Sequence, residues 1–361
     1  FWIGWLTIST LASLSLFLLT YPPITRGLWP QSEFVIMGLF ASGALAGLGL
    51  LGYFTINPKR MSVILSHPLV ILPLLIGLFS FAGSFLTDFP MRSWFGAPEL
   101  GEGALWYCAL SMLTAQAFVL KRFKKIRIAV ASFAVTSALL MTWMTHQGAH
   151  YGLWRPYFFT DYLAFLSVFL FPILVYFFKL KKPASWIIAF AVSSLPIIFS
   201  SNRAAELFLI VGPLGGLAVY GAQKWARVPR GVLAGLLALT PFCILAIEFG
   251  LGYFFPPGSG YDHLTQSMWS RYVLITSALG SLQDGNLIQL LFGHGWGSFT
   301  DIAATYIPLE ETKLYAFGSD STDKSFWDAL TRADFHSHSQ LVESLVSIGI
   351  LGALLLLLYI F

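Results

Sequence analysis

Long apolar runs alternate with short polar connections along almost the whole chain. Ten of these runs are close to the twenty residues that a helix needs to cross the hydrocarbon core of a bilayer. Glycine, proline or charged residues separate them, so the pattern predicts ten membrane-spanning helices. The predicted spans lie at about 1–22, 33–54, 63–87, 104–121, 127–145, 158–178, 184–200, 204–222, 231–249 and 338–361.

One segment, 250–337, departs from this pattern because it is far longer than an ordinary connection. It contains a Gly/Pro-rich piece, "FFPPGSGYD", then an amphipathic helical pattern, "LTQSMWSRYVLITSALGSL", and a glycine-rich turn, "FGHGWGSF". We predict a small structured cap. The expected organisation is spans one to nine over 1–249, the loop domain over 250–337 and span ten over 338–361, within a single membrane domain.

Composition agrees with an all-α polytopic membrane protein. The chain is 57% hydrophobic and 11% charged, whereas soluble domains carry about 25% charged residues. The aromatic content of 16% is typical of interfacial belts. No nucleic-acid partner is expected. Cys108 and Cys243 fall inside predicted spans and are interpreted as apolar packing residues, because no disulfide or metal spacing accompanies them.

The placement of charge predicts the orientation of the chain. Every second connection is basic and contains no Asp or Glu, and the positive-inside rule makes such connections cytoplasmic. They hold 13 of the 21 Lys and Arg residues: Lys59 and Arg60; Lys121, Arg122, Lys124, Lys125 and Arg127; Lys179, Lys181 and Lys182; Lys224, Arg227 and Arg230. The outer face therefore receives 23–32, 88–103, 146–157, the turn at 200–203 and the loop 250–337. The first apolar run is expected to be a span and not a cleaved signal peptide.

Four of the arginines on the predicted outer side are candidate site residues. Arg203, in "FSSNRAAEL", either pairs with Glu206 on one helix face or grips an anionic group such as phosphate. Arg271 lies on the amphipathic pattern of the outer loop and is either a solvated interfacial residue or a ligand-binding one. Arg92 and Arg155 each stand beside Trp and Pro and fit interfacial anchors.

The turn "FGHGWGSF" resembles a phosphate cradle only in its glycine content. No Walker sequence or strand–turn–helix context accompanies it. We interpret Gly293, Gly295 and Gly297 as residues that form a backbone turn, and His294 as structural.

Two histidines, His336 and His338, precede the last apolar run. Ser337 and Gln340 match a capping box, which would make His338 the first helical residue, where the helix dipole disfavours imidazolium. A neutral imidazole can act as a general base near pH 7. Helical periodicity favours His336 instead, because it continues the polar stripe of Gln340, Glu343 and Ser347.

Three pieces together resemble the O-antigen ligase and polymerase superfamily of bacterial inner-membrane glycosyltransferases. They are "SSNRAAELFLIVG", "SRYVLITSAL" with "LLFGHGWGSF", and "HSQLVESLVSIGILG". In the family pattern a histidine precedes two glycines by eleven and fourteen residues, which selects His338 from Gly349 and Gly352. Looser matches are "SWFGAPELGEG" and "RPYFFTDYLAF", where the family often has Asn at the position of Asp161. The family commonly has twelve spans, so two are expected beyond Phe361.

The resemblance implies a site on the periplasmic face of the inner membrane. The donor would be a glycan on undecaprenyl pyrophosphate, with Arg203 and Arg271 holding the pyrophosphate. His338 would activate an acceptor hydroxyl without a metal or cofactor, with inversion at the anomeric carbon. His336, Arg155, Asp161 and Arg92 are accessory candidates.

Several functions stay open at this stage. A ligase, which we favour narrowly, transfers the glycan to a lipid A core sugar, and a polymerase transfers it to another lipid-linked unit; a protein hydroxyl is a third acceptor. A lipid or solute transporter would need polar residues near the bilayer midplane and usually repeated halves. Here the candidate charges are expected at the outer edge, and no repeat is visible. In a non-enzymatic assembly subunit the outer arginines would be structural.

Overall fold

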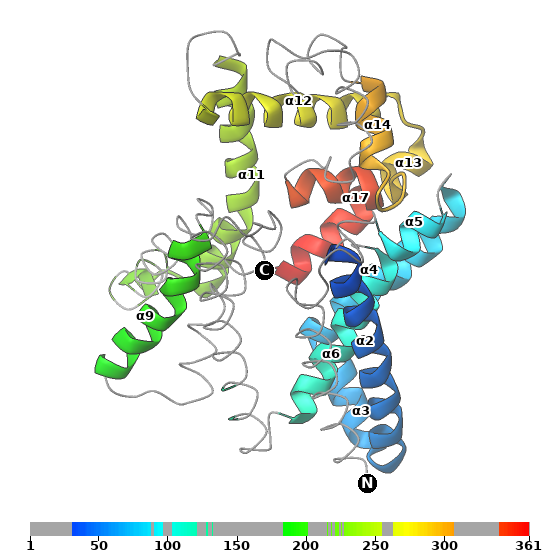
Figure 1. The fold of residues 1–361 in the computed structure, drawn as a ribbon, viewed down its shortest axis with the longest axis vertical. Coiled ribbons are helices and arrows are strands. Elements are labelled where there is room, and N and C mark those ends of the chain that lie inside the picture. The colour runs from blue at the N-terminus through cyan, green and yellow to red at the C-terminus, as the bar shows by residue number, and fades with distance from the viewer. Residues whose placement is uncertain are drawn as a thin grey trace, which may run out of the picture. The chain divides into compact units, whose positions relative to one another are not determined.

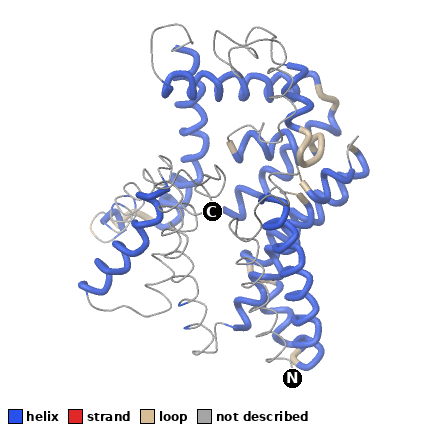
Figure 2. The backbone as a smooth tube through the Cα atoms, viewed as in Figure 1, coloured by secondary structure: helices blue, strands red, loops and turns tan. Residues whose placement is uncertain are grey.

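The computed structural model describes residues 31–87, 90–96, 103–120, 183–200, 227–254, 263–306 and 339–360, with a few isolated positions between 128 and 225. Its described residues fold into helices joined by turns, without a strand among them (Figure 2). The prediction of an all-helical protein is therefore confirmed for this part of the chain.

Four helices are long and apolar enough to cross a membrane. They are Met37–Ile56, Pro68–Leu86, Gly231–Phe254 and Leu341–Tyr359, and they correspond to predicted spans two, three, nine and ten. Shorter apolar helices, Ala104–Leu120 and Ala184–Ser194, fall on spans four and seven. These helices indicate a membrane protein. Predicted spans one and six lie outside the described residues, and spans five and eight are described only at isolated positions, so the count of ten stays a prediction.

The chain forms two compact units. One combines Phe1–Thr20, Gly27–Gln116 and Ala234–Phe361, and the other combines Tyr21–Arg26 with Ala117–Leu233. The second unit contains helix α9 (Pro183–Ser200), which matches the predicted span at 184–200. The first unit contains the described residues of the candidate site.

The third predicted span starts later than expected. Residues 63–65 belong to a separate helix, α3 (Pro58–Leu65), which lies between α2 (Gln31–Ile56) and α4 (Pro68–Gly83). Pro58 and Pro68 each begin a helix, as suits a residue without a backbone N–H. His67 caps α4, its Nδ1 accepting from the N–H of Leu69 at 3.3 Å.

Small residues bring three of the apolar helices close together. A Cβ on Gly43 of α2 would lie 2.5 Å from the Cβ of Ala109, and one on Gly77 of α4 would lie 2.7 Å from Cys108 Sγ. Ala109 and Cys108 belong to α6 (Ala104–Leu120). Such close approach of backbones is typical of helix packing in membranes, and it agrees with the packing role expected for Cys108.

The described part of the long loop, residues 263–306, contains three helices. The predicted amphipathic helix is present as α12 (His263–Asp284), and it crosses the end of α11 (Arg230–Phe254) in Figure 1. The short helices α13 (Leu287–Phe292) and α14 (Phe299–Tyr306) follow. Span nine was predicted to end at 249, but α11 continues to Phe254 because apolar and aromatic residues extend its pattern.

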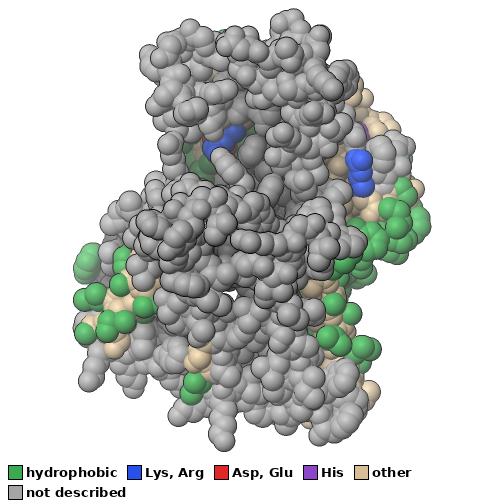
Figure 3. Space-filling view, viewed as in Figure 1, with side chains coloured by type: hydrophobic (Ala, Val, Ile, Leu, Met, Phe, Trp, Pro, Cys, Tyr) green, Lys and Arg blue, Asp and Glu red, His purple; other side chains and the backbone are tan. Residues whose placement is uncertain are grey.

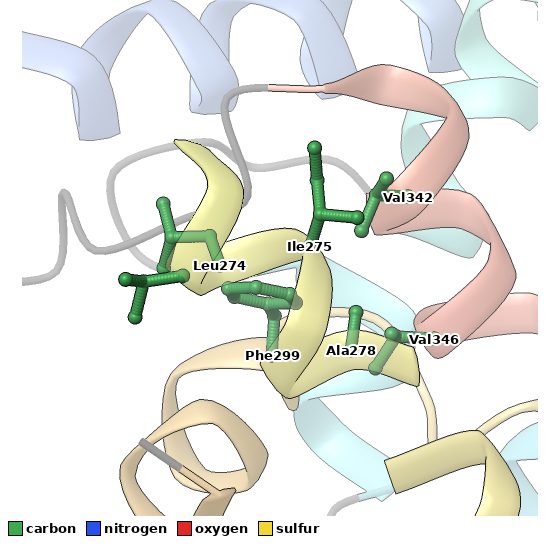
Figure 4. Close-up of a cluster of buried hydrophobic side chains, with 7 residues drawn as sticks. Leu274, Ile275, Ala278, Phe299, Val342 and Val346 are labelled. Atoms are coloured by element: carbon green, nitrogen blue, oxygen red, sulfur yellow. The ribbon is translucent and has the colours of Figure 1, made fainter. Parts of the chain in front are cut away.

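A hydrophobic cluster joins α12 and α14 to the first turns of α17 (Gln340–Ile360). Its labelled members come from all three helices: Leu274, Ile275, Ala278, Phe299, Val342 and Val346 (Figure 4). All are at most 4% exposed. This buried cluster therefore packs the described part of the loop against the first turns of α17.

Apolar side chains also cover part of the surface. They gather over the region of α2 and of α5 (Pro90–Phe95) in Figure 3, and Leu51 and Phe85 are 66% and 72% exposed. Exposed apolar surface of this extent is expected where helices face lipid.

Candidate functional site

The site predicted around the last span begins at the start of α17. The backbone N–H of Glu343 donates to the carbonyl of Ser339 at 2.9 Å, so Ser339 occupies the N-cap position and Gln340 begins the helix. The predicted capping box between Ser337 and Gln340 is therefore wrong. The helix begins two residues later than this box predicts, and His338 itself lies outside the described residues.

Two members of the polar stripe predicted along this helix are buried: Glu343 and Ser347 are 7% and 1% exposed. Ser344, which lies next to Glu343 in the sequence, is also buried, at 0%. The hydroxyl of Ser347 has no hydrogen-bond partner among the residues that the structure describes. A buried polar face on a membrane helix is costly unless it serves packing or function, so this face of α17 is a functional candidate in its own right.

Helix α17 is broken at Gly349, which has φ 66° and ψ −173°. In an unbroken helix the carbonyls of Val346 and Ser347 would accept from residues four positions later. Here they accept instead from the backbone N–H groups of His294 and Gly295, each at 2.8 Å. The glycine turn of the long loop therefore supplies hydrogen-bond donors to two carbonyls of α17 at its break.

Glycine is required on both sides of this joint. A Cβ on Gly293 would lie 2.5 Å from the backbone nitrogen of Ile348, and one on Gly349 would lie 2.5 Å from the carbonyl oxygen of Leu291. Gly293, Gly295 and Gly297 all have positive φ, at 77°, 98° and 75°. The interpretation of these glycines as turn formers is confirmed.

Trp296 anchors the turn in the helix bundle. Its Nε1 donates to Ser80 Oγ of α4 at 2.9 Å, and its ring stacks on Tyr107 of α6 with centroids 5.6 Å apart. The side chain is 1% exposed. On the other side of the turn, Arg92 Nη1 donates to the carbonyl of Gly297 at 3.4 Å, which gives this accessory candidate a structural contact.

Arg271 forms an ion pair that the sequence did not predict. Its Nη1 lies 2.6 Å from Glu248 Oε1, and the two side chains are 32% and 14% exposed. Glu248 lies near the end of α11, and the adjoining Phe249 packs on Tyr272 with ring centroids 5.0 Å apart. The missed signal was available in the sequence, because an acidic residue inside an apolar span is a functional candidate by default.

The other predicted site residues lie outside the described residues: His338, His336, Arg203, Arg155 and Asp161. Of the two that are described, Arg271 is held by α11, whereas Arg92 contacts the glycine turn. Different elements thus position them. Within the described ranges, no group of three or more His, Cys, Asp or Glu residues could hold a metal ion.

The fold and site define a helical membrane protein in which a long loop donates backbone hydrogen bonds to a helix that is broken at Gly349. Comparisons with protein-family models, curated proteins and solved structures gave no match. The function is therefore argued from the chain's own residues.

Proposed function

We propose that this protein is a membrane glycosyltransferase of the O-antigen ligase type. It would move a glycan from undecaprenyl pyrophosphate to a sugar hydroxyl of a lipid A core, on the periplasmic side of a bacterial inner membrane. The sequence resemblance motivates this function. The way in which two of the resembling pieces pack together is the structural observation that supports it.

That observation is the contact between α12 and α17. Ile275 lies beside Val342, and Ala278 lies beside Val346, within one buried cluster (Figure 4). Arg271 precedes Ile275 by four residues and lies on the same helical face. His338 precedes Val342 by four residues. Followed one turn further along α12, the line of contact leads to Arg271. His338, the proposed base, lies outside the described residues.

In the proposed reaction His338 removes the proton from the acceptor hydroxyl. The oxygen attacks the anomeric carbon, the bond from that carbon to the pyrophosphate oxygen breaks, and its electron pair leaves with the pyrophosphate. A free imidazole titrates near pH 6.5 and is mostly neutral at pH 7, which suits a base of this kind. Such a base contributes about 10²–10⁴-fold. Direct attack inverts the configuration.

Two arginines would stabilise the leaving pyrophosphate. Guanidinium groups match phosphate oxygens in geometry, and fixed positive charge at a developing anion is a large catalytic contribution. Arg271 keeps N–H donors beyond the one that contacts Glu248, since a guanidinium carries five. Arg203 is the second expected donor.

The test is transfer by purified protein in lipid vesicles, with an undecaprenyl-pyrophosphate-linked glycan and a lipid A core acceptor. We expect covalent product that persists in the presence of a metal chelator, and at least about tenfold less product from Arg271→Ala. Movement of the lipid-linked glycan across the vesicle without product would support a transporter instead.

The alternative within the same chemistry is a polymerase, whose acceptor is another lipid-linked repeat unit. The glycan profile of a deletion strain separates the two. We expect long glycans to remain on the carrier lipid, as for a ligase. Single repeat units on the carrier or on the core would identify a polymerase.

A further inference from the structure

Glu248 is an acidic residue near the end of a predicted membrane span, and it is 14% exposed. Placing a carboxylate there is unfavourable unless it has a partner. The structure provides one, because Arg271 donates through Nη1 to Glu248 Oε1 at 2.6 Å. Since the two residues are on different helices, the pair fixes the guanidinium relative to α11 as well as α12.

One Arg271 nitrogen is thus committed to Glu248, and the others are not used in this ion pair. The guanidinium is planar, so fixing Nη1 restricts the directions in which Nη2 and Nε can donate. Arg271 remains 32% exposed, which leaves it accessible. Aromatic contacts also join α11 and α12 beside this ion pair. Tyr272 packs on Phe249 and on Tyr253, the latter with ring centroids 6.0 Å apart.

We propose that Glu248 is a positioning residue for Arg271. Its carboxylate orients the guanidinium so that the remaining N–H groups face the pyrophosphate of the lipid-linked donor. This inference rests on the proposed function, and it assigns to that function a residue that neither the sequence motifs nor the resemblance includes.

An ion pair that only ties α11 to α12 would have a different signature. Its loss would lower stability, while protein that remained folded would handle the donor normally. If Glu248 positions Arg271, its loss should lower kcat/KM for the donor and leave KM for the acceptor unchanged. Misplacement of a positioning group by about 1 Å can reduce the rate about 10²-fold.

The experiment measures transfer kinetics with folded, monodisperse protein in vesicles, varying donor and acceptor separately. For Glu248→Ala we expect kcat/KM for the donor to fall about 10- to 100-fold, with an unchanged KM for the acceptor. Glu248→Gln retains an oxygen that can accept from Nη1, so it should stay within about threefold of the unsubstituted protein. The matched control is Thr240→Ala, at an exposed position on the same helix. It should change neither kcat/KM for the donor nor KM for the acceptor.

If Glu248→Ala does not fold, Glu248→Asp replaces it, because that carboxylate is shorter by one methylene and should withdraw from Nη1. Normal donor kinetics in the folded Ala or Asp variant, with Arg271→Ala impaired, would overturn the positioning role alone. A loss as large in Glu248→Gln as in Glu248→Ala would also overturn it. Absence of product from the unsubstituted protein would instead reject the proposed function.

Discussion

At the scale of single residues, Gly349 and Gly293 allow two main chains to meet without side chains between them. The φ and ψ of Gly349 lie in a region that is essentially restricted to glycine. The space next to its Cα is occupied by the backbone of Leu291. Both facts make glycine necessary at this position.

We therefore predict that Gly349→Ala strongly destabilises the protein. The backbone conformation alone costs about 1–3 kcal/mol, and the Cβ adds a clash with the Leu291 carbonyl that only a backbone shift relieves. The measurement is the apparent melting temperature in detergent, together with the yield of monodisperse protein.

The matched control is Gly250→Ala in α11, where a Cβ would meet nothing within 4 Å. Alanine also has the higher helix propensity, so stability should be unchanged or slightly raised. Equal stability of Gly349→Ala and the unsubstituted protein would contradict the role assigned to the break in α17.

Candidate site residues were accessible from the sequence to different degrees. Arg271 was found from its helical pattern and its predicted position on the outer side. Its partner Glu248 could have been singled out as an acidic residue in an apolar span. The pairing itself could not, because it joins two helices whose relative placement no local spacing encodes. The capping box at Ser337 was wrong for a similar reason, since two serines, Ser337 and Ser339, directly precede α17 and local sequence does not select between them.

At the scale of elements, the glycine turn is the piece that links the loop to the spans. Its N–H groups complete α17, and Trp296 reaches Ser80 of α4. The turn thus contacts α17 through its backbone N–H groups and α4 through the indole of Trp296. This arrangement favours a rigid loop over one that opens freely.

We predict that Trp296→Phe lowers stability modestly, by about 0.5–1.5 kcal/mol, because the ring still packs on Tyr107 but the hydrogen bond to Ser80 is lost. Ser80→Ala should have a similar effect, and the double substitution should cost less than the sum of the two. Melting temperatures of the three variants in detergent measure this coupling. Fully additive effects would argue against the Trp296–Ser80 contact.

Helix positions followed well from the apolar pattern, and their irregularities did not. The spans predicted at 33–54, 104–121, 184–200 and 338–361 match described helices within a few residues. The pattern merged part of α3 with α4 and gave no sign of the break at Gly349. Apolar periodicity reports which residues avoid water, whereas a helix break depends on main-chain hydrogen bonds supplied by a distant segment.

At the scale of the whole molecule, orientation in the membrane determines whether the proposed chemistry is feasible. The basic helix α3 is predicted to face the cytoplasm, and the loop with α12 to face the periplasm. Lys59 and Gln283 are both exposed and can report the two sides.

We predict that single cysteines at these positions label from opposite sides. The background replaces Cys108 and Cys243, which are both free thiols. A membrane-impermeant maleimide should label Gln283→Cys in cells whose outer membrane is permeable and whose inner membrane is intact. It should label Lys59→Cys only after the inner membrane is opened. The reverse pattern would place the candidate site on the cytoplasmic side and contradict the proposed use of a periplasmic donor.

The most direct test of the proposed function compares His338→Ala with His336→Ala in the vesicle transfer assay. If His338 is the general base, its removal should reduce the transfer rate by about 10²–10⁴-fold while expression and melting temperature stay unchanged, and His336→Ala should be much milder. Near-normal product from folded His338→Ala protein would contradict the assignment.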